Sequence, residues 1–376
     1  MLETTLRSPA GSLDTWTSQT SGTTNSLNAI VYAAPVFAAV GNGGTILTSS
    51  NGVDWASQNS GTTNNLYGIT HANGLFLAAG QGPIRTSADG IAWAGHVAPL
   101  SVLHGVTYGN GLFVAVGVSG TIGTSSNGTN WFPQSSGAGS TTLSAVTYAN
   151  GRFVAVGGAA AVILTSTNGT NWTSVSPGAG VYSLLGVAFG RDKFVAAGGS
   201  APVARGGSIT ISADGLTWGP KNSGIALENL YGVSWGNGSF VAVGGSGGFV
   251  GSAYTNRIIL TSSDASSWAT RIADTNNSLA GVAYGNGSFV AVGYGGTVLQ
   301  SGPIFTLAAT SQSMGGGFEL VLTGEVGRSY RIQASANLAD SNWTDLINFT
   351  NTDETMEFLD FQATNYTWRY YRAVSP

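Results

Sequence analysis

The sequence lacks cysteine, has few charged residues and contains no long apolar run. Among its 376 residues, Asp, Glu, Lys and Arg together make up 8%, and Lys plus Arg number 13. The absence of cysteine excludes disulfides, zinc–thiolate sites and thiol nucleophiles. So few basic residues form no stripe that could neutralise phosphates, which argues against nucleic-acid binding. No segment approaches the roughly 20 apolar residues of a membrane-spanning helix, so we expect no membrane insertion.

What is abundant is glycine, with 57 residues, together with aromatic residues at 10%. Glycine between β-branched and aromatic residues is typical of many short strands joined by tight turns. The remaining polar positions are mostly Ser, Thr and Asn. This charge-poor composition fits an exported bacterial protein. The start of the chain, residues 1–5 (MLETT), has no basic region and no apolar stretch of the kind a signal peptide needs, so we expect the signal peptide of such a protein to be absent from this chain.

A repeated phrase dominates the sequence and is typified by residues 279–293 (LAGVAYGNGSFVAVG). Its phenylalanine occurs seven times, at Phe37, Phe76, Phe113, Phe153, Phe194, Phe240 and Phe289. A second phrase ends in tryptophan at Trp16, Trp55, Trp93, Trp131, Trp172, Trp218 and Trp268. These tryptophans are 39, 38, 38, 41, 46 and 50 residues apart. Periods of about 40 to 50 residues are typical of propeller blades.

Each repeat divides into four short segments with strand composition, separated by Asn-Gly or Asp-Gly turns that favour hairpins. Four-stranded units repeated radially predict an all-β propeller, here with seven blades over residues 1–302. The first tryptophan segment, near Trp16, has no partner strands before it, whereas the last repeat has no tryptophan segment after it. We therefore expect the Trp16 strand to complete the seventh blade and to close the ring, which leaves no unpaired half-blade.

The turn before each tryptophan resembles the Asp box, which is found in sialidases, xyloglucanases, sortilin-type receptors and photosystem assembly factors. The matching residues are 87–93, 212–218 and 262–268, whereas Asn51, Asn127 and Asn168 replace the acid in other repeats. An Asp or Asn side chain at this position caps its own turn. In the enzymes of this family the box lies far from the ligand face. The resemblance therefore implies structural roles for these acids and tryptophans.

The repeat ends near residue 302, and residues 303–376 predict a small β-sandwich. Three segments carry a resemblance, namely residues 327–335 (GRSYRIQAS), 342–344 (NWT) and 369–374 (RYYRAV). They resemble C-terminal domains of exported proteins from Verrucomicrobia and related bacteria. This resemblance implies an extracellular setting but no reaction.

Few residues are suited to catalysis. The three arginines and the Arg-Ile-Pro signature that sialidases require have no counterpart. Once the turn acids are set aside, Glu228 and Asp274 fall in equivalent loops of neighbouring repeats, so they form the one plausible acid–base pair of a glycosidase. Two solvated loop acids remain the simpler interpretation. His71 replaces a repeated Tyr and is expected to pack in the core, and His96 is assigned to a loop. No metal-binding spacing is present, so we expect neither a metal nor a cofactor.

Positions at which the repeats differ are better candidates for a ligand site. The residue after the first leucine of each repeat varies, and we expect it to lie at the channel mouth: Asn28, Tyr67, His104, Ser144, Leu185, Tyr231 and Ala280. Of these, Tyr67, His104 and Tyr231 offer aromatic faces and hydrogen bonds. Two longer loops in the fifth and sixth repeats add Arg205, Tyr254 and Arg257. Neutral drift of tolerant loops is an equally good explanation of these insertions.

From the sequence we expect a non-catalytic, extracellular or cell-surface binding or scaffolding module that acts as a monomer. Its partner would be a glycan or a surface protein bound on the loop face of the propeller. The alternative is a carbohydrate-active hydrolase that uses Glu228 and Asp274 as an acid–base pair. An assembly-factor role rests on analogy of fold alone.

Overall fold

The computed structural model describes residues 13–158, 160–199, 207–225, 228–245, 257–271, 277–302, 305–309, 317–324, 329–336, 343–353, 355–366 and 369–374. Within these residues the chain is all-β, and its helical structure is confined to the short 3₁₀ turns 42–44, 118–120, 294–296 and 363–365. Two compact units are present. The larger unit comprises residues 16–285 and 289–300, and the C-terminal unit includes residues 301–376.

The described part of the larger unit contains seven four-stranded antiparallel sheets. Their first strands are β2 (Leu27–Ala33), β6 (Leu66–Ala72), β10 (Leu103–Gly109), β14 (Leu143–Ala149), β18 (Gly186–Gly190), β22 (Asn229–Gly236) and β26 (Leu279–Gly285). The second strands are β3 (Val36–Gly41), β7 (Leu75–Gly80), β11 (Leu112–Gly117), β15 (Arg152–Gly157), β19 (Lys193–Gly198), β23 (Ser239–Gly245) and β27 (Ser288–Gly293). The predicted all-β, four-stranded organisation is confirmed.

The two outer strands of each sheet are together shorter than its two inner strands. The third strands are β4 (Ile46–Ser49), β8 (Ile84–Ser87), β12 (Ile122–Ser125), β16 (Val162–Ser166), β20 (Ser208–Ser212), β24 (Arg257–Ser262) and β28 (Val298–Ser301). The outermost strands are β5 (Ala56–Gln58), β9 (Ala94–His96), β13 (Phe132–Gln134), β17 (Thr173–Val175), β21 (Gly219–Asn222), β25 (Ala269–Arg271) and β1 (Trp16–Gln19). Strand β1 is paired with β28, so the sheet order there is β1-β28-β27-β26.

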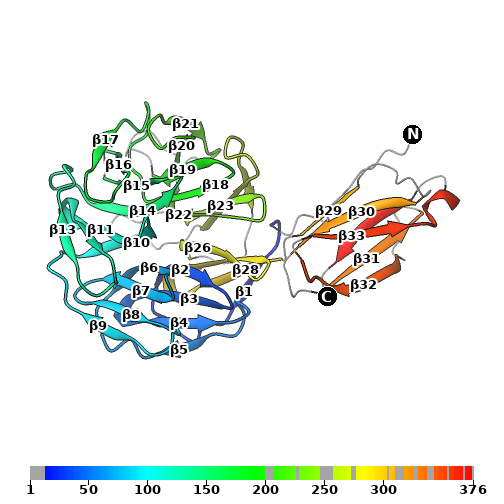
Figure 1. The fold of residues 1–376 in the computed structure, drawn as a ribbon, viewed down its shortest axis with the longest axis horizontal. Coiled ribbons are helices and arrows are strands. Elements are labelled where there is room, and N and C mark those ends of the chain that lie inside the picture. The colour runs from blue at the N-terminus through cyan, green and yellow to red at the C-terminus, as the bar shows by residue number, and fades with distance from the viewer. Residues whose placement is uncertain are drawn as a thin grey trace. The chain divides into compact units, whose positions relative to one another are not determined.

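The sheets of the larger unit lie around a common centre, with their first strands innermost (Figure 1). Contacts between these strands run in cyclic order: β2 with β6, β6 with β10, β10 with β14, β14 with β18, β18 with β22, β22 with β26, and β26 with β2. The hairpin turns after them behave as the sequence predicts. Asn110 and Gly111, for example, have φ values of +46° and +77°, the left-handed region that such turns require.

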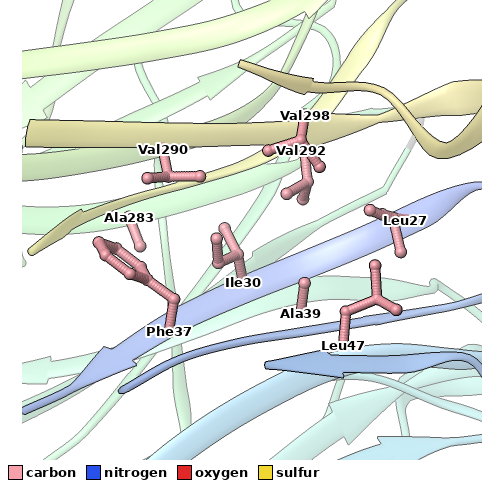
Figure 2. Close-up of a cluster of buried hydrophobic side chains, with 9 residues drawn as sticks. All are labelled: Leu27, Ile30, Phe37, Ala39, Leu47, Ala283, Val290, Val292 and Val298. Atoms are coloured by element: carbon pink, nitrogen blue, oxygen red, sulfur yellow. The ribbon is translucent and has the colours of Figure 1, made fainter. Parts of the chain in front are cut away.

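Apolar residues between neighbouring sheets form the core. Each second strand carries the repeated Phe, which packs on the aromatic residue of the first strand, as Phe37 does on Tyr32 with ring centroids 4.5 Å apart. Figure 2 shows the cluster that joins the first and last sheets, in which Leu27 and Phe37 face Val290 and Val292. Fully burying side chains of this size contributes about 1.5–3 kcal/mol each. Packing between neighbouring sheets therefore stabilises the position of the first strands at the centre.

The C-terminal unit contains two three-stranded antiparallel sheets, in the orders β29-β30-β33 and β32-β31-β34. The strands are β29 (Thr306–Ala309), β30 (Phe318–Thr323), β31 (Ser329–Ser335), β32 (Thr344–Thr350), β33 (Thr355–Asp360) and β34 (Tyr370–Val374). Alternate residues of both sheets, among them Leu320, Tyr330 and Ala373, form one buried cluster. The two sheets therefore pack face to face.

Candidate functional site

The first strands of the seven sheets surround a cavity of about 220 Å³. Three consecutive residues near the start of each first strand line it. The first residue of each triplet is Asn28, Tyr67, His104, Ser144, Leu185, Tyr231 or Ala280. The second is Ala29, Gly68, Gly105, Ala145, Gly186, Gly232 or Gly281, and the third is Ile30, Ile69, Val106, Val146, Val187, Val233 or Val282. None of the described lining residues carries a charge when His104 is in its neutral form.

The first, second and third residues of these triplets form three tiers of the cavity lining. The residues of the second tier are small, which allows the first strands to approach one another closely. A Cβ atom added to Gly68 would lie 2.7 Å from the His104 carbonyl oxygen and 3.2 Å from Gly105 Cα. The same approach occurs at Gly232, where an added Cβ would lie 2.9 Å from the Ala280 carbonyl oxygen. The strand register shifts beside this tier, between Leu103 and Gly105 for instance, as in a β-bulge. The same shift occurs in β2, β6, β14 and β22, and in each of these strands the first-tier residue is the one left unpaired.

Tyr67 is held in place by amide side chains. Its hydroxyl accepts hydrogen bonds from Asn65 Nδ2 at 3.3 Å and from Gln81 Nε2 at 3.2 Å. Its ring lies against the His104 imidazole, with ring centroids 5.1 Å apart and an angle of 49° between the planes. Tyr67 and His104 thus form a pre-positioned aromatic pair on one side of the cavity, and neutral amides fix its orientation.

Burial lowers the pKa of His104, so its neutral form is favoured. Beside this pair, Asn28 Nδ2 donates to the Leu66 carbonyl oxygen at 2.7 Å and to Asn42 Oδ1 at 3.0 Å. The bond to Leu66 links the amide of Asn28 to the neighbouring sheet, and the bond to Asn42 stays within its own sheet unit. The aromatic side of the cavity therefore offers neutral donors and acceptors.

The structure brings together three of the predicted ligand-binding residues and separates a fourth from them. Tyr67, His104 and Tyr231 line the same cavity, and Asn229 Nδ2 donates to the Tyr231 hydroxyl at 3.5 Å. Arg257 begins strand β24 and is not among the lining residues. Arg205 and Tyr254, the other two predicted ligand residues, lie outside the described residues.

The proposed catalytic pair is placed only in part. Glu228 directly precedes β22 and is partly buried, and it is not among the residues that line the cavity. Asp274 lies outside the described residues. Within the described residues, no group of three or more His, Asp or Glu side chains is arranged to hold a metal ion.

The acids of the box-like turns bind main-chain groups. Asp214 Oδ1 accepts hydrogen bonds from the N–H groups of Leu216 and Thr217, both at 2.8 Å, and from Ser212 Oγ at 2.9 Å. These bonds, led by that from Thr217, lower its pKa to about 2. Asn51 caps its turn in the same way without a charge, by accepting from the N–H groups of Val53 and Asp54. The predicted turn capping is confirmed.

The other two histidines have packing or hydrogen-bonding roles. His71 packs on Phe76 with ring centroids 4.4 Å apart, in the position that Tyr32 holds against Phe37. The assignment of His96 to a loop was wrong, because it ends strand β9 and its Nε2 lies 2.8 Å from Thr86 Oγ1. His96 is therefore the last residue of the outermost strand of its sheet.

Two features of the site were missed by sequence reasoning. One is the set of amides around Tyr67, namely Asn65 in a loop and Gln81, which directly follows strand β7. The other is the aliphatic third tier beneath the first. The sequence signal for this tier was the Val or Ile that follows each small residue, since it recurs as regularly as the leucine before it.

Comparison with known proteins identifies the fold of the larger unit. No protein-family model and no curated protein matches the sequence. Among solved structures, YCF48 bound to D1 peptide has a TM-score of 0.60 at 16% identity, covering 79% of this chain and 99% of that one. A catalytically inactive virginiamycin B lyase from Staphylococcus aureus with quinupristin has a TM-score of 0.65 at 10% identity, covering 77% and 99%. The WD40 propeller domain of Doa1 has a TM-score of 0.57 at 14% identity, covering 76% and 97%.

These similarities establish that the larger unit has a β-propeller fold. At such low identities they carry no information on ligand or reaction. No helix among the described residues is long and apolar enough to cross a membrane.

Proposed function

We propose that the larger unit is a closed, seven-bladed propeller of the Asp-box type, with β1 as the outer strand of its last blade. The cyclic contacts of the first strands and the pairing of β1 with β28 support closure. The side-chain caps at Asp89, Asp214 and Asp264, repeated by asparagines elsewhere, support the Asp-box relationship. In this architecture the turn acids and tryptophans stabilise the blades, and the ligand site lies elsewhere.

We infer that the propeller is a non-catalytic binding module that receives one neutral group of a larger partner at its channel mouth. The observation that carries this proposal is the convergence of seven first-tier side chains on one uncharged cavity. Its volume of about 220 Å³ lies below the range of about 300–1,000 Å³ that is usual for small-molecule sites. A single side chain or sugar unit fits, while the rest of the partner would lie on the surrounding loops.

A polypeptide is the first candidate partner. Among propellers of similar fold, YCF48 was solved with a peptide bound, which supports a peptide-binding role here by analogy. A glycan is the second candidate, because the Tyr67–His104 pair joins aromatic faces with neutral hydrogen-bonding groups. We propose an extracellular or cell-surface location and a monomeric state on the basis of composition. Detection of the native protein in culture medium and light scattering in solution test these two points.

The hydrolase alternative depends on Glu228 and Asp274. The cavity lining contains no carboxylate among its described residues, so a general acid or base would have to reach it from the loops. The binding proposal needs no such movement. Wild type and the Glu228→Gln variant should be assayed for sugar release from a panel of polysaccharides. Release by wild type that the variant loses would favour the hydrolase.

Peptide and glycan arrays test the binding proposal. Wild type is expected to select one class of ligand, and Tyr67→Ala is expected to bind the same ligands at least about tenfold more weakly, the effect of about 1.4 kcal/mol. Phe132→Ala is the matched control, since it removes an exposed ring from an outermost strand. Equal binding by wild type and Tyr67→Ala would contradict the assigned site.

A further inference from the structure

Strand β8 carries an arginine at a position that several other sheets fill with a buried leucine. Arg85 pairs with Ala78 of the second strand. In four other sheets the residue of the third strand that pairs with the corresponding alanine is leucine, namely Leu47, Leu164, Leu260 and Leu299. These four side chains are at most 1% exposed. The fold is therefore compatible with leucine at residue 85 and does not itself require an arginine there.

The side chain of Arg85 lies over Gly95, its partner in the outermost strand β9. A Cβ atom added to Gly95 would lie 2.5 Å from Arg85 Nη1, 3.0 Å from Cζ and 3.6 Å from Nε. In five other sheets the residue at this point has a side chain, as Ser57 and Thr270 do. The missing side chain at Gly95 thus leaves room for the guanidinium group over the edge strand of the sheet.

The guanidinium group of Arg85 has few partners within the protein. Its Nη2 donates to the Gly61 carbonyl oxygen at 3.1 Å, while its Nε is buried and has no hydrogen-bond acceptor. No carboxylate of the described residues forms an ion pair with Arg85. A cation that has lost part of its hydration and has no counter-charge gains more from an incoming anion than a fully hydrated one does. Arg85 is therefore suited to pairing with a carboxylate from outside the chain.

The edge of β9 offers a partner more than this single charge. The sheet order is β6-β7-β8-β9, so within the described sheet no strand pairs with the outer side of β9. Strand β9 also lacks a proline, whereas β13 and β21 contain Pro133 and Pro220. An extended peptide can add to such an edge through main-chain hydrogen bonds. One exposed ion pair alone contributes little, which favours a peptide over a free anion.

We propose that the β9 edge binds an extended acidic peptide segment, with an Asp or Glu residue of the peptide opposite Gly95 and paired with the Arg85 guanidinium. Residues directly opposite each other on neighbouring strands have Cβ atoms about 5 Å apart, so a carboxylate at that point is within reach of the guanidinium. Main-chain pairing supplies affinity, and the charge pair selects the acidic residue. Neither Arg85 nor Gly95 lines the channel cavity, so this site does not depend on the role proposed for it.

Phage display of random linear heptapeptides on the full chain tests the edge site. Peptides that the Tyr67→Ala variant still binds are kept, which sets aside ligands of the channel mouth. We expect these peptides to be enriched in Asp or Glu, and fluorescence anisotropy measures the affinity of synthetic copies. Arg85→Leu should bind the copies at least about tenfold more weakly, because a hydrogen bond to a charged group contributes at least this factor. Copies with the acid replaced by its amide should bind wild type and Arg85→Leu equally.

Two further variants separate a positioned guanidinium from charge in general. Gly95→Ala keeps the arginine but places a Cβ atom where the guanidinium lies, so it should also weaken binding. Arg331→Leu removes the same charge from the C-terminal unit and should bind as wild type does. Urea unfolding checks the fold of Arg85→Leu, which should be at least as stable as wild type because leucine occupies this position in four other sheets.

Several results would overturn the proposal. They are a lack of acidic residues in the selected peptides, and peptide binding by Arg85→Leu or by Gly95→Ala that is as tight as that of wild type. Unfolding of Arg85→Leu at a clearly lower urea concentration would assign the arginine to stability instead. Binding of polygalacturonate by wild type but not by Arg85→Leu, with no acidic peptide selected, would assign the charge to an acidic polysaccharide.

Discussion

Replacing Asp214 by Ala or by Asn separates a structural role of the box acids from a catalytic one. The carboxylate accepts three hydrogen bonds, from the N–H groups of Leu216 and Thr217 and from Ser212 Oγ. Asn127 makes the equivalent contacts through its amide oxygen, with the N–H groups of residues 129 and 130. If the acid only caps the turn, Asn should replace it and Ala should not.

The magnitude follows from the hydrogen bonds that are lost. Each contributes about 0.5–1.5 kcal/mol net, and loss of a comparable side-chain cap costs about 0.5–2 kcal/mol. Because the Asp214 turn is exposed to water, which replaces part of what is lost, we expect Asp214→Ala to lower the free energy of unfolding by about 1–2 kcal/mol. Asp214→Asn keeps the acceptor oxygen, so its loss should be less than about 0.5 kcal/mol.

Both variants also differ from wild type in their response to pH. The pKa of Asp214 falls from 3.8 to about 2 in the folded protein, chiefly through the hydrogen bonds from Thr217 and Leu216. A lowered carboxyl pKa contributes stability above pH 3.8 that is lost as the pH falls through 2. Solvent screening at this exposed site keeps the contribution small. Asp214→Asn lacks the titrating group and should lose less stability over this interval.

Urea unfolding followed by tryptophan fluorescence, at pH 7 and across the acid range, measures both effects. Asp264→Asn offers a second test, since Asp264 caps its turn through the same contacts. Equal destabilisation by Asp214→Asn and Asp214→Ala at pH 7 would refute the reasoning. It would mean that the negative charge of Asp214, and not its acceptor oxygen, stabilises the turn.

Three further predictions concern the strands and turns around the channel. Gly109→Ala should lower the unfolding free energy by about 1–3 kcal/mol, because its Cβ would lie 2.0 Å from Tyr148 Cγ. Asp192→Gly should raise it by about 0.5–1 kcal/mol, because Asp192 has a φ of +57° where five of the other six repeats have glycine. Burial lowers the pKa of His104 from 6.5, so its neutral form stabilises the protein above that pH and this contribution declines on acidification; His104→Gln should lose less stability between pH 7 and 5. Chemical unfolding of each variant beside wild type measures all three.

The result that would contradict each of these predictions can be stated. Gly219→Ala places its Cβ where no atom lies within 4 Å, so it should be neutral; equal losses at Gly109 and Gly219 would remove the steric explanation. A drop in stability for Asp192→Gly would show that its side chain contributes more than its backbone costs. His71, whose pKa burial also lowers, supplies residual pH dependence in His104→Gln. An unchanged pH profile in that variant would contradict the burial argument.

The fold could be predicted because each blade repeats the same local instructions. Asn110-Gly111 sets a hairpin, Phe113 fills the space between sheets, and the leucine before the bulge begins a first strand. These signals are short-range and recur, so they reinforce one another. The pairing of Trp16–Gln19 with β28 could also be anticipated, because both ends of the repeat region were incomplete in complementary ways.

The candidate site was harder to predict because side chains distant in sequence compose it. Variation among the blades pointed to Tyr67 and His104, but nothing local shows that Asn65 and Gln81 both bond to the Tyr67 hydroxyl. Likewise, the spacing of Asp360 from Arg369 in the C-terminal unit gives no sign that they meet as a buried pair. Such contacts depend on strand register and on bulges, which single-residue patterns specify poorly.

The most direct test of the central claim is the affinity of an array-selected ligand for wild type and for two channel-mouth variants, measured by isothermal titration calorimetry. Tyr67→Ala and Tyr231→Ala alter different first strands that line one cavity. If a single group of the partner occupies that cavity, each variant should weaken binding by at least about tenfold, while Phe132→Ala should bind as wild type does. Affinities within about twofold of wild type for both channel variants would show that the partner binds elsewhere.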